Sequence, residues 1–403
     1  MQVRHHLRNF SDIINGEKGI KQSFKDYLTT AKPLRGGDKP ISDDQQEEYF
    51  NALCGRTNFD AFIKNHLFGY KSVYEITDIE KINNICLKIR NKEEDYSNST
   101  RKSALKHYLN FLTFKIGNVM LPIDIKDCLK SNYNIILNGA PGTGKTFLAR
   151  QIAAKMIGCK EEELKNKPQF GFVQFHPSYD YTDFVEGLRP KNQNGNIVFE
   201  RKDGVFKQFC KKALEEECPF VFVIDEINRG EISKIFGELF FSMDPGYRGV
   251  DGSVNTQYQN MITEKKDPFI NGFYVPENVY VIGTMNDIDR SVESMDFAFR
   301  RRFAFKKISA KDTQFAILKN LNSDLREVAI SKMNALNEMI SSSELGLSTD
   351  YHIGAAYFNK IKNYANNWEI LWNNHLKGVL SEYFRGNPVA ENNLKKLKDA
   401  YNS

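Results

Sequence analysis

The sequence has few cysteines and histidines, and neither residue type is spaced for metal binding. Its six cysteines contain no C-x-x-C pair, and its seven histidines form no ligand-like cluster with them. Structural zinc sites and disulfide frameworks depend on such spacings. We therefore expect neither of them, and a chain that stays reduced.

Long apolar runs are also missing from the sequence. No stretch approaches the roughly 18 apolar residues that a membrane-spanning helix needs. The first residues, Met1 to His6, lack the apolar segment of a secretory signal peptide. We therefore expect a protein without a membrane segment.

Charge of one sign is scarce too. The 403 residues carry a formal net charge of only +5, and their 41% hydrophobic and 27% charged content is that of ordinary globular proteins. So mild a balance does not by itself indicate a nucleic-acid partner. One helical segment holds Arg101, Lys102, Lys106 and His107, which could meet DNA phosphates or form a solvated face beside a core stripe.

What the chain does contain is a glycine-rich loop with phosphate-binding spacing. An apolar run at residues 134–137 precedes it and a helix-like segment follows, which is the context that the G-x-x-x-x-G-K-[ST] pattern requires. The glycines let successive N–H groups point at one anion, and the helix N-terminus adds partial positive charge. We predict that a nucleotide is bound by Gly139, Ala140, Pro141, Gly142, Thr143, Gly144, Lys145, Thr146 and Phe147.

Two of these side chains have chemical roles of their own. Lys145 is expected to reach the β- and γ-phosphates, and the Thr146 hydroxyl is expected to ligate Mg²⁺. The alternative is a glycine turn that merely joins a strand to a helix, and the flanking pattern disfavours it.

A pair of carboxylates follows a second apolar run, residues 220–224. Five apolar residues without alternation predict a strand buried on both faces, as in a parallel sheet. Ligands of such sheets bind at the carboxyl ends of the strands, where Asp225 and Glu226 lie. Asp225 suits Mg²⁺ coordination, and Glu226 suits the base that orients and polarises an attacking water.

A third apolar run, residues 279–284, leads to Asn286. An amide at that strand end can hydrogen-bond the γ-phosphate or the lytic water, although a simple turn asparagine is the alternative. The next predicted helix closes with Arg300, Arg301 and Arg302. These arginines could complete a neighbouring subunit's site or simply complement the helix dipole, and their position relative to the other motifs favours the first interpretation.

These elements predict an α/β fold with a parallel sheet flanked by helices. We expect a mostly helical N-terminal domain at residues 1–117, a nucleotide-binding α/β domain at 118–310 and a helical lid at 311–403.

Taken together, the motifs resemble one family. The phosphate loop is followed by D-E-I-N-R at 225–229, by M-N-x-x-D-R-S at 285–291 and by D-x-A-x-R-R-R-F at 296–303. This order is similar to that of the McrB-like AAA+ GTPases of McrBC-type, modification-dependent (type IV) restriction systems. Residues 353–358 and 382–384 are similar to that family's lid, and the match covers roughly residues 118 to 390.

The resemblance implies a hexameric AAA+ ring in a prokaryotic cytoplasm, with GTP rather than ATP as substrate and Mg²⁺ as cofactor. It also implies a separate McrC-like nuclease subunit and DNA as partners in antiviral restriction. By motif position it places Asn286 and Asp289 in the hydrolytic signature, and Arg301 and Arg302 at the arginine finger.

The sequence departs from this family at its front and lacks two features elsewhere. Residues 1–117 do not resemble a methylcytosine-flipping domain, so they could recognise methylated DNA, another modification, RNA or a protein. We find no nuclease cluster of carboxylates and lysine, so cleavage would come from a partner. We also find no lid arginine of the kind that touches phosphate in many AAA+ proteins.

Three functions are compatible with these residues. The first is a ring motor that uses a nucleoside triphosphate, GTP by resemblance, to translocate or remodel DNA for a nuclease. The second is an ATP-driven remodeller or chaperone that acts on proteins. The third is a nucleotide switch with little turnover, which the presence of Glu226 and Asn286 disfavours, because a pure switch needs no water-polarising acid.

Overall fold

The computed structural model describes residues 42, 44–45, 108, 118–288 and 297–403. The chain divides into two compact units: residues 122–314 with 332–403, and residues 1–121 with 315–331. The first unit contains the phosphate loop. The predicted N-terminal domain of residues 1–117 lies almost wholly outside the described residues, and the domain boundaries near 117 and 310 stay predictions.

Five parallel strands form the central sheet of the first unit. They are β1 (Asn134–Gly139), β2 (Phe170–Gln174), β5 (Phe220–Asp225), β6 (Val279–Asn286) and β7 (Ala304–Lys307). Their order across the sheet is β2-β5-β6-β1-β7, and each neighbouring pair runs parallel. The predicted parallel sheet is therefore confirmed, with the three apolar runs named above in its central strands.

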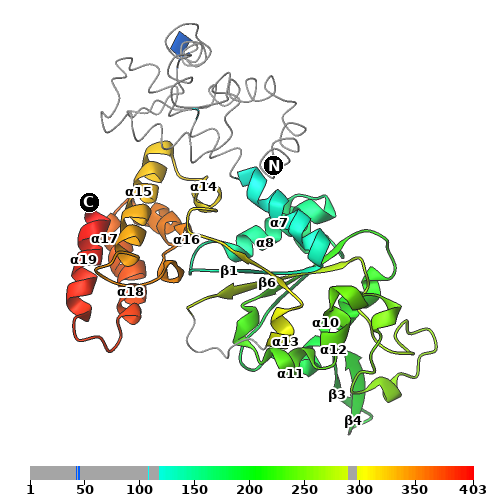
Figure 1. Cartoon of the computed structure of the whole chain (residues 1–403). Helices are drawn as coiled ribbons and strands as arrows, with labels where there is room; N and C mark the ends of the chain where they lie inside the picture. The colour runs from blue at the N-terminus through cyan, green and yellow to red at the C-terminus, as the bar shows by residue number, and fades with distance from the viewer. Residues whose placement is uncertain (1–41, 43, 46–107, 109–117, 289–296) are drawn as a thin grey trace. The chain divides into compact units, whose positions relative to one another are not determined.

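Helices cover both faces of this sheet, with α7 and α8 on one face and α10 to α13 on the other (Figure 1). They are α7 (Asn118–Asn132), α8 (Lys145–Ile157), α9 (Tyr181–Phe184), α10 (Val205–Ala213), α11 (Ile232–Phe236), α12 (Leu239–Met243) and α13 (Phe297–Arg300). Short 3-10 turns lie at Glu161–Asn166, Ile227–Arg229, Pro245–Tyr247, Val250–Gly252 and Gln259–Met261. Two covered faces explain why β5 is buried from Phe220 to Ile224 and carries no polar alternation.

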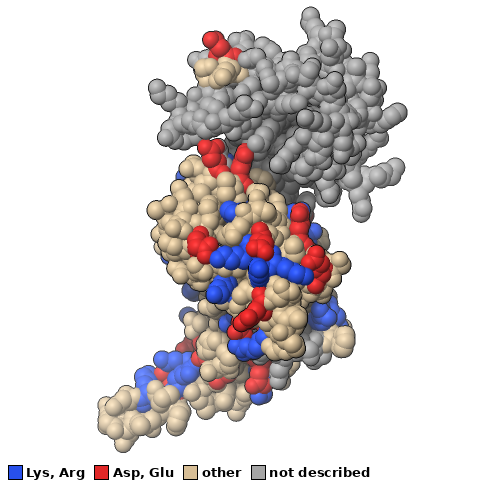
Figure 2. Space-filling view, turned by 90° about the vertical axis from the view of Figure 1, so that its left-hand side faces the viewer, with Lys and Arg blue, Asp and Glu red and all other residues tan. Residues whose placement is uncertain are grey.

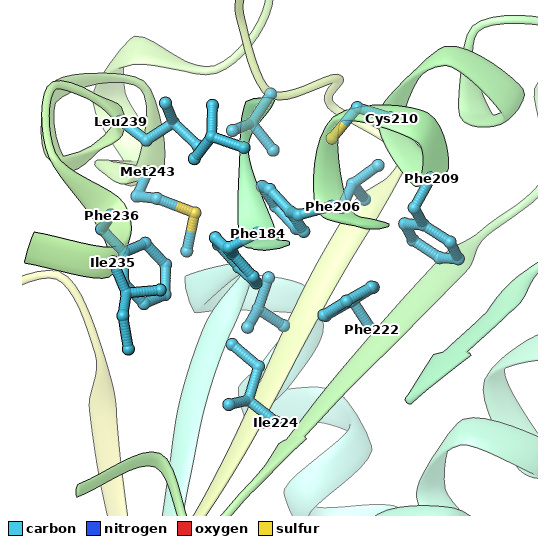
Figure 3. Close-up of a cluster of buried hydrophobic side chains, with 14 of the residues drawn as sticks. Phe184, Phe206, Phe209, Cys210, Phe222, Ile224, Ile235, Phe236, Leu239 and Met243 are labelled. Atoms are coloured by element: carbon cyan, nitrogen blue, oxygen red, sulfur yellow. The ribbon is translucent and has the colours of Figure 1, made fainter. Parts of the chain in front are cut away.

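A cluster of phenylalanine side chains fills the space between the sheet and α10 to α12 (Figure 3). The rings of Phe184 and Phe206 stack with their centroids 4.8 Å apart. Phe222 of β5 meets Phe206 edge-on at 5.1 Å. Such pairs add about 0.5–1.5 kcal/mol beyond the burial of their area, so this cluster fixes the helices against the sheet.

A β-hairpin that the sequence analysis did not predict lies between α9 and α10 in the chain. It pairs β3 (Glu186–Gln193) with β4 (Asn196–Asp203) in antiparallel register. Its two-residue turn is Asn194 and Gly195, whose φ angles are 53° and 83°. Positive φ at both central residues matches the right-handed twist of the strands, which is why Asn-Gly suits this position.

Buried charges attach the base of this hairpin to α10. The Lys207 ammonium lies 2.7 Å from the Glu186 carboxylate, and both side chains are fully buried. Arg201 also contacts Glu186 at 2.7 Å, and the backbone N–H of Tyr258 donates to the same carboxylate at 2.9 Å. A buried carboxylate needs this number of partners, because each unpaired charge in a low-dielectric interior costs several kcal/mol.

The C-terminal region is helical, as predicted for the lid. Its helices are α14 (Gln314–Ile317), α15 (Ser323–Ile340), α16 (Ala355–Phe358), α17 (Trp368–Leu371), α18 (Lys377–Tyr383) and α19 (Ala390–Asn402), with 3-10 turns at Thr349–Tyr351 and Asn359–Tyr364 and a π-helical turn at Trp372–Leu376. Trp372 and Tyr401 are buried there with ring centroids 5.1 Å apart. The Lys332 ammonium lies 4.8 Å from the Tyr401 ring and donates to the Tyr401 carbonyl at 2.7 Å.

Charged side chains of both signs are interspersed on the face drawn in Figure 2. On the lid, several form exposed ion pairs, such as Lys396 with Glu344 at 2.9 Å and Lys398 with Glu369 at 2.6 Å. Pairs of this kind contribute about 0–1 kcal/mol each. Among the described residues, no helix is long and apolar enough to cross a membrane.

Candidate functional site

The phosphate loop connects β1 to α8 and has a backbone that only glycine adopts readily. Gly139, Gly142 and Gly144 have φ angles of 153°, 74° and 78°. A Cβ atom on Gly139 would lie 2.3 Å from the Ile308 carbonyl oxygen. The loop therefore needs glycine both for its left-handed turns and for the close approach of β7's following residue.

Within this loop, the side chains of Thr143 and Lys145 donate hydrogen bonds to backbone carbonyl groups at the start of the loop. The Thr143 hydroxyl donates to the Ala140 carbonyl at 2.9 Å. The Lys145 ammonium donates to the Gly139 and Ala140 carbonyls at 3.0 and 2.8 Å. Phe147 lies in the first turn of α8 and is partly buried. The predicted loop residues are thus assembled as one compact turn at the N-terminus of α8.

Lys145 also reaches across the sheet edge to Asn286. Its ammonium donates to Asn286 Oδ1 at 2.8 Å, and only 7% of the residue is exposed. Burial lowers the pKa of Lys145 to about 8, although the nearby Glu226 carboxylate opposes this shift. A phosphate beside this ammonium would favour its charged form further.

Thr146 and Asp225, the two residues predicted to hold Mg²⁺, lie in hydrogen-bond contact. The Thr146 hydroxyl donates to Asp225 Oδ1 at 2.6 Å, and the Thr284 hydroxyl donates to the same oxygen at 2.6 Å. Hydroxyl and carboxylate oxygens are the hard donors that Mg²⁺ takes, together with water and substrate phosphate. The Thr146 and Asp225 oxygens therefore fit this ion. The contact of Thr284 with Asp225 is one that the sequence analysis missed.

Glu226 follows Asp225 in a strained backbone conformation. Its φ of 51° lies in the left-handed region, which non-glycine residues rarely adopt and which is commonest at functional sites. Its N–H donates to the Thr284 hydroxyl at 3.2 Å. This turn directs the carboxylate toward Asn286, whose Nδ2 donates to its two oxygens at 2.8 and 3.1 Å.

The environment of Glu226 favours a basic carboxylate. Burial raises its pKa most, and the adjacent Asp225 adds to the increase. Arg229, whose Nε lies 3.3 Å from a Glu226 oxygen, lowers the pKa in opposition, as do Lys145 and Asn286. The net result is a pKa above the usual value, which suits a group that accepts a proton near neutral pH.

The sheet register explains why these side chains converge. Gly139 at the end of β1 lies opposite Asn286 at the end of β6, and Ile224 of β5 lies opposite Gly283. The carboxyl ends of three adjacent parallel strands therefore deliver the loop, the amide and the acids to one edge.

Two further asparagines at this edge were not predicted as site residues. Asn138 donates from Nδ2 to both oxygens of Asp287, at 3.0 and 3.1 Å. Asn228 is 7% exposed, and its Nδ2 lies 3.4 Å from the Asn286 carbonyl. Among the described residues, the buried Oδ1 atoms of Asn138 and Asn228 have no hydrogen-bond partner. A polar residue between the apolar run and the glycine-rich loop was the available sequence signal for Asn138.

Arg300, which ends α13, and the two arginines that follow it lie in different environments. Arg302 is 8% exposed, donates to the Ala298 carbonyl and lies over the Phe240 ring at 5.6 Å. Arg300 is exposed and lies 5.2 Å from the Phe305 ring centroid, whereas the Arg301 side chain is exposed to solvent. Within the described residues, none of the three hydrogen-bonds to Lys145, whose partners are Gly139, Ala140, Thr143 and Asn286. Asp289 lies outside the described residues.

Comparison with known families gives a match over the nucleotide-binding region. Residues 134–303 match the family described as AAA domain (dynein-related subfamily). Together with the parallel sheet and the helices on both of its faces, this match confirms the predicted AAA+ fold. It does not by itself assign a role to any single side chain.

The chain is also similar to two restriction components. Over 231 residues it is 44% identical to the type IV methyl-directed restriction enzyme EcoKMcrB subunit of Escherichia coli (strain K12), a match that covers 56% of this chain and 47% of that protein. Over 212 residues it is 26% identical to the type II restriction enzyme BsuMI component YdiS of Bacillus subtilis (strain 168), covering 46% and 59%. The matches thus span about half the length of these curated relatives.

One of the similar solved structures has a low TM-score. A putative ATPase from Cytophaga hutchinsonii has 14% identity and a TM-score of 0.29, with 69% of this chain and 79% of that chain covered. A likeness of this size carries no argument about function.

Proposed function

We propose that this McrB-like AAA+ protein hydrolyses a nucleoside triphosphate, GTP in preference to ATP, and couples hydrolysis to the movement of DNA for a partner nuclease. The observation that carries the proposal is the hydrogen-bonded series from Lys145 through Asn286 to Glu226. It joins a phosphate-binding ammonium to a basic carboxylate through one amide. A binding-only site has no need of the third member.

In this mechanism, water attacks the γ-phosphate in line with the departing β-phosphate oxygen. Glu226 orients this water and accepts its proton, and the raised pKa of the Glu226 carboxylate favours this transfer. Asn286 holds the carboxylate in place and can share the water. Lys145 and the N–H groups of the phosphate loop bind the phosphates and stabilise charge that moves toward the leaving group.

Thr146 and Asp225 would hold Mg²⁺ when the nucleotide binds. With Mg²⁺ bound there, the site would gain charge neutralisation for the triphosphate. The other contributions described above belong to side chains and backbone groups of this chain.

The arginine contribution comes from a neighbouring subunit in a ring, which the resemblance suggests is a hexamer. Arg301 is the better placed of the two proposed finger residues, because its side chain is exposed while the Arg302 guanidinium lies against its own domain. Asp289 is proposed as a further member of the hydrolytic signature on its place in the M-N-x-x-D-R-S string. The isolated subunit would then be a slow hydrolase.

The restriction role rests on similarity and on motif order. The chain is 44% identical over 231 residues to a protein named as a restriction enzyme subunit. GTP as substrate, DNA as the translocated polymer and an McrC-like nuclease subunit as partner are proposed on that basis. The N-terminal residues 1–117 would select the target.

The test compares phosphate release from GTP and from ATP by the purified full chain with Mg²⁺, alone and with DNA and the partner nuclease. We expect GTP to be the faster substrate, with turnover that increases when DNA and nuclease are added. Exclusive use of ATP, stimulated by unfolded protein and not by DNA, would contradict this proposal and support a protein remodeller.

A further inference from the structure

The lid lies directly on the phosphate loop through backbone hydrogen bonds. The N–H of Gly354 donates to the Pro141 carbonyl at 2.9 Å, and the N–H of Ala356 donates to the Gly142 carbonyl at 3.0 Å. Both donors come from the segment that begins α16. Both acceptors lie in the part of the loop that is predicted to face phosphate.

A third carbonyl of the loop is held in the same way. The hydroxyl of Thr313, near the start of the lid, donates to the Thr143 carbonyl, and Thr313 is 3% exposed. Three consecutive carbonyl groups, those of Pro141, Gly142 and Thr143, therefore accept hydrogen bonds from outside the loop.

Because the peptide bond is planar, hydrogen bonds that hold the loop carbonyls also set the direction of the N–H groups that follow them. In a trans peptide, the carbonyl of one residue and the N–H of the next point in opposite directions. Fixing the three carbonyls outward thus fixes the N–H groups of Gly142, Thr143 and Gly144 toward the other side of the loop. Within the described part of the chain, these three N–H groups donate no hydrogen bond. Successive N–H groups that converge in this way form an anion-binding concavity.

The backbones of lid and loop leave no space between them. A Cβ atom on Gly354 would lie 2.1 Å from the Gly142 carbonyl carbon and 2.2 Å from the Thr143 nitrogen. A Cβ atom on Gly142 would lie 2.5 Å from the ring of Tyr357. Because the first two are contacts with backbone rather than with a flexible side chain, a larger residue at 354 cannot be accommodated without moving the lid or the loop.

We infer that the lid, through the N–H groups of Gly354 and Ala356 and the hydroxyl of Thr313, holds the phosphate loop in its anion-binding conformation. These three are positioning residues, which act on the phosphates through the loop and not by contact. The inference rests on the proposed binding of a nucleoside triphosphate. It also supplies a role for a lid whose only arginine between residues 332 and 403, Arg385, is exposed and paired with Glu382 at 2.6 Å.

The inference predicts reciprocal coupling between lid and nucleotide. A ligand that binds the organised loop more tightly than the loosened loop must also stabilise lid docking by the same factor. Weakening the lid contact should therefore lower nucleotide affinity while the hydrolytic groups Glu226 and Asn286 keep their places.

The test uses Gly354→Ala with Gly378→Ala as its matched control. Both substitutions add one methyl group to a lid glycine, but a Cβ atom on Gly378 would meet nothing within 4 Å. We expect Gly354→Ala to weaken binding of fluorescently labelled GTP and ATP by at least about tenfold, while the control binds like the unsubstituted chain. KM for hydrolysis should rise with kcat little changed, whereas partial misfolding would lower kcat and leave KM unchanged.

Thr313→Val is the second variant, because valine keeps the shape of threonine and removes only the donor. It should raise KM in the same direction by a smaller factor, with thermal unfolding without nucleotide showing that the chain is folded. If the unsubstituted chain binds nucleotide and both variants bind it equally well, the inference is wrong and the proposed function stands. If the unsubstituted chain binds neither GTP nor ATP, both are overturned.

Discussion

The side-chain amide of Asn286 donates to both carboxylate oxygens of Glu226, at 2.8 and 3.1 Å. The same side chain accepts from the Lys145 ammonium through Oδ1 at 2.8 Å. One amide therefore connects the group expected to bind phosphate with the group expected to activate water. These two contacts also fix the orientation of the amide, because its oxygen faces the Lys145 ammonium and its nitrogen faces the Glu226 carboxylate.

This arrangement predicts how Asn286→Ala changes the pH dependence of hydrolysis. Glu226 must be ionised to act as a base, so the rate falls as pH falls through its pKa. Burial already raises that pKa, and the Asn286 donor counteracts part of the increase. Removing the donor should lower kcat and move the acid limb of the kcat–pH profile to higher pH.

The control for this prediction is Asn373→Ala, because the Asn373 amide also donates to a carboxylate but at an exposed position, 3.3 Å from Glu369. Its profile should match that of the unsubstituted protein. An Asn286→Ala profile with an unmoved acid limb would show that Glu226 does not set it.

The lowered pKa of Lys145 predicts that the protein takes up a proton when nucleotide binds. Its pKa is lowered to about 8 by burial in the protein without nucleotide, so near pH 8 about half of the ammonium groups are deprotonated. Bound phosphate favours the charged form and raises the pKa, so binding at pH 8 takes up a proton, and affinity declines as pH rises further.

Calorimetric titrations in buffers of different ionisation enthalpy measure this uptake. It should be substantial near pH 8 and much smaller near pH 6.5, where Lys145 is already charged. Lys145→Arg is the control, because a guanidinium stays charged at both pH values. Equal uptake by the variant and the unsubstituted chain would assign the proton to another group.

The central strands could be predicted because burial on both faces gives each of them an uninterrupted apolar run in the sequence. β5 is buried on both faces and therefore has no polar alternation, which is why the run from Phe220 to Ile224 indicated a parallel sheet. β7 (Ala304–Lys307) escaped prediction because it lies at the sheet edge, is mostly exposed and ends in two lysines. The hairpin was also missed, although Asn194-Gly195 is a strong turn signal.

The sequence could predict that the site residues meet at one edge of the sheet, but it could not predict the contacts between them. Strand ends that carry Asp225, Glu226 and Asn286 must meet in a parallel sheet, so their convergence followed from the motif order. The contact of Gly354 with Gly142 depends on how the lid docks, and no periodicity along the chain encodes it. The difference between Arg301 and Arg302 likewise depends on which side chain the tertiary fold buries.

Substitutions of the two arginine-finger candidates, Arg301 and Arg302, should affect different properties of the protein. Arg301→Ala should lower hydrolysis in assembled rings on the order of a thousandfold and leave folding unchanged, because its side chain is exposed. Arg302→Ala should instead lower the free energy of unfolding, because it removes the donor to Ala298 and the contact with Phe240.

A mixing experiment tests whether Arg301 acts across subunits. The Arg301→Ala subunit keeps Lys145, and the Lys145→Ala subunit keeps Arg301. In a mixed ring, some interfaces between neighbouring subunits therefore contain both an intact Lys145 and an intact Arg301. Partial recovery of phosphate release on mixing two inactive variants is expected. No recovery in rings shown to contain both subunits would contradict action in trans.

The buried pair of Lys207 and Glu186 predicts a large effect on stability. Lys207→Met removes one of the two cations that pair with the buried Glu186 carboxylate and should lower the free energy of unfolding by about 3 kcal/mol. Lys191→Met in the same hairpin is the control, because its partner Glu200 is exposed and the pair contributes about 1 kcal/mol or less. Denaturant titrations of both variants measure the difference, and equal losses would contradict it.

The most direct test of the hydrolytic centre is phosphate release by Glu226→Gln. Glutamine keeps the size of the side chain and the capacity to meet Asn286 but cannot accept the proton of water, so turnover should fall at least about 100-fold while nucleotide binding persists. Glu231→Gln is the matched control, because Glu231 is an exposed carboxylate paired with Lys234 at the same turn. Loss of turnover in the first variant alone is the predicted result, and undiminished turnover in Glu226→Gln would contradict the account.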